Sequence, residues 1–316
     1  MSAVAVIFPG QGSQALGMGV DVAAQSPQAR ALFDSSKAIL GYDLLALQRN
    51  GPEEKLRETQ YSQPAIFVTN VALFASVCDA LASQIVVGAG HSFGEFCALY
   101  AAGALTFEDA LTIVNERGKA MQHAAELAPG GMSAVLGLDA QTIRRIVEET
   151  RASTGTRIAL ANFNSPTQIV ISGDLAGVGV AGDAMLRAGA KRVIALNVSG
   201  AWHSDLMDEA VGRFESAVNA APFRMPSFDV LSNVDARVYR DVETIKKNLV
   251  LSITREVRWH ETAERILEYK PDAAFEFGAS GVLGPLMKRM PGAPSVTVVS
   301  DFAAGDGVRA TVSGAA

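Results

Sequence analysis

The sequence is poor in the residues from which disulfides and metal sites are built. Only two of its 316 residues are cysteines. Both lie in apolar helical patterns, so we expect reduced, packed thiols rather than a disulfide framework. No C-x-x-C pair occurs and the four histidines are widely separated, so no metal site is predicted. The residues concerned are Cys78, Cys97, His91, His123, His203 and His260.

Long apolar runs and an excess of positive charge are also missing. No run reaches the ~20 residues that a membrane-spanning helix needs. The segment Met1–Val4 lacks the basic start of a secretory signal. The net charge of −6 argues against a nucleic-acid partner. We therefore expect a cytoplasmic protein that binds neither nucleic acid nor membranes.

What the sequence does contain is typical of a large α/β protein. Hydrophobic residues make up 49% of the chain and charged residues 19%, enough for a sizeable core. Predicted strands and helices alternate along most of the chain, which indicates a parallel sheet. Between 131 and 198 the order is instead βαββαβ, the split-βαβ or ferredoxin-like unit. We therefore predict a core formed by 1–130 and 199–316, with a ferredoxin-like subdomain, 131–198, inserted into it.

Three local predictions complete this outline. Residues 50–60 are polar and marked by Gly-Pro, which indicates a loop. A long helix is expected from about Ser62 to Leu81, with a proline in its first turn. Residues 303–316 are rich in Gly, Ala and Ser, and we expect them to be disordered.

The chemistry of the chain centres on residues 85–96. A β-branched run leads into Gly90-His91-Ser92-Phe93-Gly94 and then into a helix-compatible stretch. This is G-x-S-x-G between a strand and a helix, the setting of a nucleophile elbow. The glycines permit a sharp turn that exposes the Ser92 hydroxyl at a helix N-terminus. The plainer interpretation is an ordinary turn with a capping serine.

A serine nucleophile needs a base within hydrogen-bond reach, and histidine is the natural choice near neutral pH. His91 is adjacent to Ser92 and must point away from it. His123 and His260 lie inside helical segments. His203, in a Gly-containing junction after a strand, is the best-placed candidate, although alone it would be read as a cap or a surface residue. The sequence marks no Asp or Glu as its partner.

Two further segments carry unusual features. On the helix predicted over 107–126, Arg117 falls within an apolar stripe. A buried arginine needs a partner, so it pairs with a protein carboxylate, extends to solvent, or receives an anion from the substrate. The stripe leaves these three options open. The Gly-rich loop 8–14 matches neither a P-loop nor a dinucleotide fingerprint, but its N–H groups can receive an anion.

Taken together, these motifs resemble the malonyl-CoA:acyl carrier protein transacylase family, which includes the discrete fatty-acid enzyme and the acyltransferases of polyketide synthases. The matching motifs follow one another in order along nearly the whole chain. They are 8–14 (FPGQGSQ), 90–95 (GHSFGE), 117–122 (RGKAMQ), 162–166 (NFNSP), 168–173 (QIVISG) and 199–204 (SGAWHS).

The resemblance implies a hydrolase-like α/β core with a ferredoxin-like insert, in agreement with the outline above. It implies Ser92 as acyl nucleophile and His203 as general base and then general acid. The main-chain N–H groups of Gln11 and Phe93 would form the oxyanion hole. Arg117 would bind the free carboxylate of a malonyl group.

This sequence departs from the family pattern at four positions. In the family a main-chain carbonyl orients the histidine; Ser252 is expected to supply it, where glutamine is usual, with Glu256 in place of proline. Phe93 replaces a small aliphatic residue or glutamine, and its side chain is expected to reshape the acyl pocket. Trp202 stands where phenylalanine is frequent, and its bulk predicts rejection of an α-methyl branch. Asn162 is a further predicted substrate contact.

The predicted reaction is ping-pong transfer of malonyl from malonyl-CoA to the phosphopantetheine thiol of an acyl carrier protein. No cofactor is implied, because the CoA thioester is a substrate. Two alternatives stay open: an acyl hydrolase that uses the same Ser92 and His203, and a docking module with a decayed site. Fatty-acid and polyketide pathways are not distinguished. Basic candidates for docking an acidic carrier protein are Arg187, Lys191, Arg192, Lys288 and Arg289.

Overall fold

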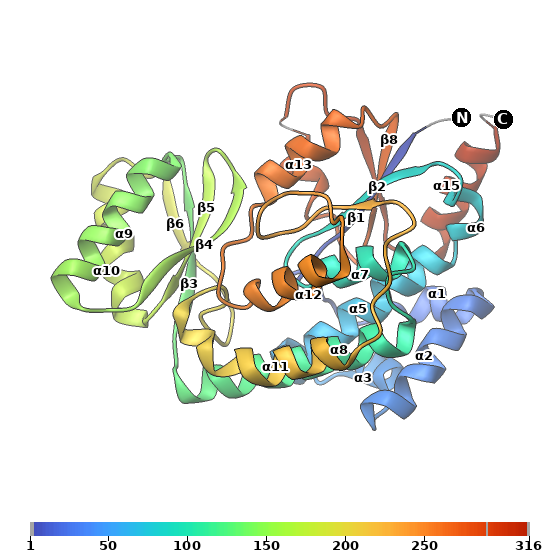
Figure 1. Ribbon diagram of the computed structural model, residues 1–316, viewed down its shortest axis with the longest axis horizontal. Coiled ribbons are helices and arrows are strands. Elements are labelled where there is room, and N and C mark those ends of the chain that lie inside the picture. The colour runs from blue at the N-terminus through green and yellow to red at the C-terminus, as the bar shows by residue number, and fades with distance from the viewer. Residues whose placement is uncertain (1–2, 289, 315–316) are drawn as a thin grey trace.

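The computed structural model describes residues 3–288 and 290–314, and its larger sheet forms the centre of the molecule (Figure 1). The strands of this sheet are β1 (Val4–Phe8), β2 (Ile85–Gly90), β7 (Asp229–Val230), β8 (Ala273–Phe277) and β9 (Ser295–Val299). All pairs are parallel, in the order β7-β2-β1-β8-β9. Alternate residues of β1 belong to apolar clusters on opposite faces, so the sheet is buried on both sides.

Helices cover both faces of this parallel sheet (Figure 1). They are α1 (Val20–Gln25), α2 (Pro27–Leu40), α3 (Leu44–Asn50), α4 (Glu53–Arg57), α5 (Thr59–Ala75), α6 (Cys78–Leu81), α7 (Gly94–Ala101), α8 (Phe107–Leu127), the short 3₁₀ helix η1 (Asp205–Met207), α11 (Asp208–Ala220), α12 (Val242–Leu251), α13 (Trp259–Glu268), α14 (Gly284–Met287) and α15 (Phe302–Gly314). α5, α7 and α8 pack in the cluster that holds Phe8, and α13 packs in the one that holds Ile7. Each such buried side chain contributes about 1.5–3 kcal/mol. Within the described residues, we find no helix long and apolar enough to cross a bilayer.

The second sheet lies at one end of the long axis (Figure 1). Its elements are β3 (Gly131–Leu136), α9 (Ala140–Thr154), β4 (Ile158–Ser165), β5 (Gln168–Gly173), α10 (Leu175–Arg187) and β6 (Arg192–Ala195). The strand order is β4-β5-β3-β6 and every pair is antiparallel. α9 and α10 pack on it through a separate apolar cluster. The predicted order βαββαβ is confirmed, and all six elements lie between the predicted boundaries 131 and 198.

The edge strand β4 joins the second sheet to the core. Val257, just before α13, donates its N–H to the Ala161 carbonyl (2.8 Å) and accepts from the Phe163 N–H (2.8 Å). The His91 ring is hydrogen-bonded through Nε2 to Asn164 Oδ1 (2.9 Å). These bonds bring β4 beside the turn that follows β2, which is where the predicted nucleophile lies.

The structure corrects the three local predictions. Residues 50–60 contain α4 and the start of α5, so they are not a simple loop. The long helix begins at Thr59, because the Glu58 carbonyl accepts the N–H groups of Tyr61 and Ser62, and it ends at Ala75 before the separate α6. The predicted proline, Pro64, therefore lies inside α5 rather than in its first turn.

The predicted disorder after residue 302 is also wrong. Residues 302–314 form α15, and the last two residues of the chain lie outside the described part. Tertiary contacts explain the helix: Val308 is buried in the main cluster, Arg309 bonds to the Ser76 carbonyl, and Asp301 accepts from the Ala304 N–H (2.8 Å). A composition that favours disorder is overridden here by packing.

Candidate active site

Ser92 lies on a sharp turn between β2 and α7. Its φ is 54°, in the left-handed region that residues with a side chain rarely adopt. A Cβ at Gly90 would lie 1.9 Å from the Gly94 carbonyl carbon, and one at Gly94 would lie 2.3 Å from the Phe8 oxygen. Only glycine fits at either position. The nucleophile-elbow geometry is thus confirmed, with the Ser92 hydroxyl at the start of a helix.

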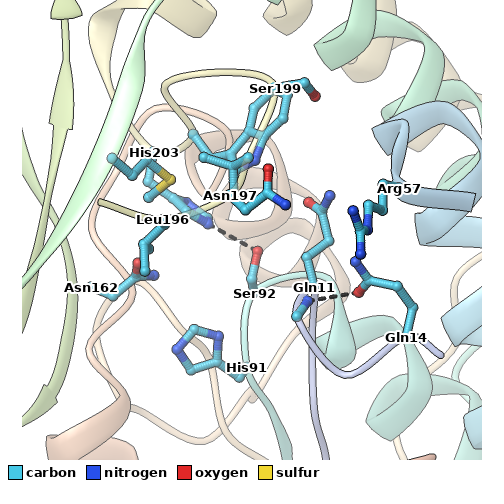
Figure 2. Close-up of a pocket in the computed structure, with 14 residues that line it drawn as sticks. Gln11, Gln14, Arg57, His91, Ser92, Asn162, Leu196, Asn197, Ser199 and His203 are labelled. Atoms are coloured by element: carbon cyan, nitrogen blue, oxygen red, sulfur yellow. Dashed lines mark hydrogen bonds between the residues drawn. The ribbon is translucent and has the colours of Figure 1, made fainter. Parts of the chain in front are cut away.

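The His203 ring lies within hydrogen-bond distance of this hydroxyl. Its Nε2 lies 2.9 Å from Ser92 Oγ (Figure 2). Its Nδ1 lies 2.8 Å from the Ser252 carbonyl and 3.1 Å from the Arg255 carbonyl. Since carbonyls only accept, Nδ1 carries the proton and Nε2 accepts from the serine hydroxyl. The structure therefore fixes the tautomer that a general base requires.

The environment of His203 keeps its ring neutral. Burial lowers the pKa of His203 from 6.5 to about 3, with smaller effects from the charges of Arg117 and His91. The Ser252 hydroxyl bonds to the Leu249 carbonyl (2.6 Å), so only the main chain of Ser252 faces the histidine. The replacement of the usual glutamine by serine therefore leaves the hydrogen bond between the Ser252 carbonyl and His203 in place. The Arg255 carbonyl makes a second hydrogen bond to His203 that the sequence did not indicate.

Arg117 lies against the same serine. Its guanidinium is fully buried, and its Nη2 lies 3.4 Å from Ser92 Oγ. Nη1 donates to Gln63 Oε1 (2.8 Å), and Nε has no hydrogen-bond partner in the described part of the chain. Burial lowers the pKa of Arg117 to about 10, an effect opposed by the charge of Glu95, so the group stays cationic at neutral pH.

Two of the three options for this arginine are now excluded. Complete burial of the Arg117 side chain excludes extension to solvent. No carboxylate lies within 4.0 Å of it among the residues that the structure describes. A buried cation is costly unless an anion compensates it, and the charge of Glu95 acts on Arg117 only from beyond ion-pair distance, so the option of an anion supplied by the substrate stays open.

A cavity of about 360 Å³ opens onto Ser92 and His203. Among the predicted site residues, Gln11 and Asn162 also line it (Figure 2), as does Trp202. Arg117, Phe93 and Ser252 do not line it. The expectation that the Phe93 side chain reshapes the acyl pocket is wrong, because that side chain packs in the main apolar cluster.

The loop after β1 packs against the elbow after β2. Because the two strands are parallel neighbours, their carboxyl ends meet at the same edge of the sheet. A Cβ at Gly10 would lie 2.5 Å from the His91 oxygen, which shows how closely the loop approaches. We find no hydrogen-bond partner within the described residues for the main-chain N–H of Gln11 or of Phe93. Both amides are free to donate to a ligand.

Several residues of this site were not predicted from the sequence. Gln63, in the second turn of the buried helix α5, accepts a hydrogen bond from Arg117, and a polar side chain in such a helix was an available signal. Asn233 binds the Ser92 main chain, and Glu95 binds Asn233. No pattern links positions so far apart in sequence.

Comparison with known proteins decides the family. A model of the acyl transferase domain matches residues 5–288. The chain belongs to the acyl transferase family. The malonyl CoA-acyl carrier protein transacylase of Salmonella typhimurium is 39% identical to this acyl transferase over 290 residues, 92% of this chain and 93% of that protein.

Solved structures agree with this assignment. The malonyl CoA-acyl carrier protein transacylase of Coxiella burnetii superposes on this acyl transferase with a TM-score of 0.93 at 34% identity, covering 98% of both chains. A malonyl-transacylase solved in complex with a type II PKS acyl-carrier protein has a TM-score of 0.91 at 38% identity, covering 98% of this chain and 100% of that one. The expected fold class, a parallel α/β core with an antiparallel second sheet, is confirmed.

Proposed function

We propose that this acyl transferase moves a malonyl group from malonyl-CoA to the phosphopantetheine thiol of an acyl carrier protein. The observation that carries the proposal is the placement of a serine hydroxyl between a neutral imidazole and a buried guanidinium that has no direct ion-pair partner among the described residues. Relatives that cover nearly the whole chain are named for this reaction, and one was solved with a carrier protein. The reaction needs no cofactor, because the thioester is itself a substrate.

The proposed mechanism has two symmetrical halves. Ser92 Oγ attacks the thioester carbonyl while its proton passes to His203 Nε2, and that proton leaves with the CoA thiolate. The malonyl-serine ester is then attacked by the carrier thiol, whose proton passes to His203 and finally to Ser92 Oγ. Main-chain N–H groups of Gln11 and Phe93 receive the oxyanion in both halves, each contributing about 3–4 kcal/mol.

Acyl selectivity is proposed to rest on Arg117 and Trp202. The unpaired Nε and the long Nη2 contact leave donors of Arg117 available for the free carboxylate of malonyl. Trp202 lines the cavity and is almost fully buried, and a Cβ at Gly200 would lie 2.6 Å from its ring. We expect this fixed ring to hinder an α-methyl branch on the acyl group. Asn162, on β4, lines the same cavity and is a proposed substrate contact.

Mass spectrometry of the protein after incubation with malonyl-CoA tests the proposal. We expect a malonyl adduct on Ser92 that is discharged when a carrier protein bearing its phosphopantetheine thiol is added. The Ser92→Ala variant should show no adduct. No adduct on the native protein would favour a docking module. An adduct that water discharges at the same rate without carrier protein would favour the acyl hydrolase.

A further inference from the structure

The backbone of Ser92 is held by a side chain that has no part in the proposed chemistry. Asn233 follows β7, the strand that pairs with β2. Its Oδ1 accepts from the Ser92 N–H (3.2 Å), and its Nδ2 donates to the Ser92 carbonyl (3.1 Å). One amide group thus binds both polar main-chain groups of a residue whose φ is 54°. Such a conformation persists only where the surroundings enforce it.

A buried carboxylate fixes the orientation of that amide. Glu95, in the first turn of α7, is 1% exposed. Its Oε2 accepts from Asn233 Nδ2 (2.6 Å), and its Oε1 accepts from the Tyr239 hydroxyl (2.5 Å). A carboxylate only accepts, so the nitrogen end of the Asn233 amide must face it and the oxygen end must face the Ser92 N–H.

This arrangement depends on the charge of Glu95. Burial raises the pKa of Glu95 to about 7, opposed by the hydrogen bonds from Tyr239 and Asn233 and assisted by the charge of Asp235. The negative charge of Glu95 also raises the pKa of Arg117, which lies on α8. A proton on Glu95 would occupy a position at which a donor already points. The two accepted bonds are therefore both available only above that pKa.

We propose that Asn233, oriented by Glu95 and Tyr239, is a positioning residue that holds the backbone of Ser92 in its left-handed conformation for attack. The inference rests on the proposed role of Ser92 as nucleophile, but it requires neither malonyl selectivity nor a carrier protein. It can therefore be tested with a reagent that reports the reactivity of Ser92 alone.

The test measures the rate at which a fluorophosphonate modifies Ser92, together with single-turnover malonylation. For Asn233→Ala we expect both rates to fall about 10- to 100-fold, the loss expected from a misplaced reacting group, with little change in the half-saturating malonyl-CoA concentration. Gln48→Ala is the matched control. Its buried amide bonds to Ala65 and Thr69 on α5, so it should lower thermal stability without changing either rate per folded molecule.

A second pair of variants keeps the test decisive if Asn233→Ala does not fold. Glu95→Gln preserves size but can accept only one of the two bonds, and Tyr239→Phe removes one donor without touching Asn233. Both should slow fluorophosphonate labelling. The native labelling rate should fall as the pH drops through about 7, whereas Glu95→Gln should lose this dependence. A purely structural role would not move the pH profile.

The outcomes separate this inference from the proposed function. Native labelling rates in folded Asn233→Ala, or in both Glu95→Gln and Tyr239→Phe, would overturn the positioning role. Rapid labelling of the native protein without any malonyl adduct would instead overturn the proposed substrate and leave the positioning of Ser92 supported.

Discussion

Arg117 is the residue from which acyl selectivity is expected to arise. A guanidinium and a carboxylate about 4 Å apart attract each other by roughly 4 kcal/mol at an effective dielectric of 20. An acetyl group would leave the buried cation unpaired, which costs about 2–5 kcal/mol. Arg117→Ala should therefore lose malonyl transfer and gain acetyl transfer in relative terms. The measurement is kcat/KM for malonyl-CoA and acetyl-CoA, with Arg117→Lys as the charge-preserving control. An unchanged ratio in Arg117→Ala would refute the carboxylate-binding role.

His203 should not titrate in the physiological range. Its pKa in the folded protein is lowered from 6.5 to about 3, so the ring stays neutral between pH 5 and 8. The unfolded chain binds a proton near pH 6.5 that the folded chain does not, so this residue makes the free energy of unfolding fall as the pH drops below 6.5. NMR of labelled histidine checks the prediction, with the signal assigned by its loss in His203→Gln. A His203 signal that titrates near pH 6.5 would contradict it.

Site residues that belong to a recognisable local motif could be predicted from the sequence. Site residues outside any such motif could not. The elbow motif marked Ser92, the junction marked His203, and the apolar stripe marked Arg117; the structure brings these three side chains together. Asn233 lies 141 residues from Ser92, in the segment that follows the two-residue strand β7. Its partnership with Ser92 arises only from the pairing of β7 with β2, which no local pattern encodes.

The elbow is the element whose sequence is most tightly constrained. Gly90→Ala would place a Cβ 1.9 Å from the main chain of Gly94, where no side-chain rotation relieves the clash. We expect a loss of about 3 kcal/mol or more in the free energy of unfolding. Gly212, exposed on α11 with open space around it, is the control. Gly212→Ala should stabilise the protein by about 0.5–1 kcal/mol. Chemical denaturation measures both changes. Equal free energies of unfolding for the two variants would show that the close approach of Gly90 to Gly94 does not require glycine at position 90.

Elements with a clear apolar period were predictable, and elements that depend on distant contacts were not. The sequence predicts a buried strand over 4–8 and amphipathic helices over 107–126 and 140–151, and β1, α8 and α9 lie within three residues of these bounds. α15 was missed because its composition is weakly apolar. It is stabilised by contacts with α6 and β9 and by the bond between Arg309 and Ser76.

At the scale of the whole molecule, charge distribution should decide how an acidic carrier protein binds. The chain carries a net charge of −6, so docking requires a local basic surface. Arg187, Lys191 and Arg192 are exposed on α10 and at the start of β6, whereas Lys288 is exposed beside α14 and Arg289 lies outside the described residues.

Reversal of two of these charges tests the first surface. Lys191→Glu with Arg192→Glu should raise the KM for carrier protein, and added salt should reduce the difference from the native protein. Arg30→Glu with Lys37→Glu, on α2 at the other end of the long axis (Figure 1), is the charge-matched control. An unchanged KM in the first pair would exclude that surface as the dock.

The two-sheet arrangement itself was predictable from the order of elements, because βαββαβ has a characteristic strand order. The way the sheets join was not. It depends on Val257, which pairs with β4 from a segment that follows it by almost a hundred positions, and on the bond between His91 and Asn164.

The left-handed backbone at Ser92 and His203 has a consequence for attempts to improve the protein. Their φ values are 54° and 58°, which glycine adopts freely and other residues adopt at a cost of about 1–3 kcal/mol each. A mutant library screened for heat resistance alone should therefore become enriched in glycine at both positions. The selected variants would be heat-stable but would lack catalytic activity, so any such screen must also select for turnover.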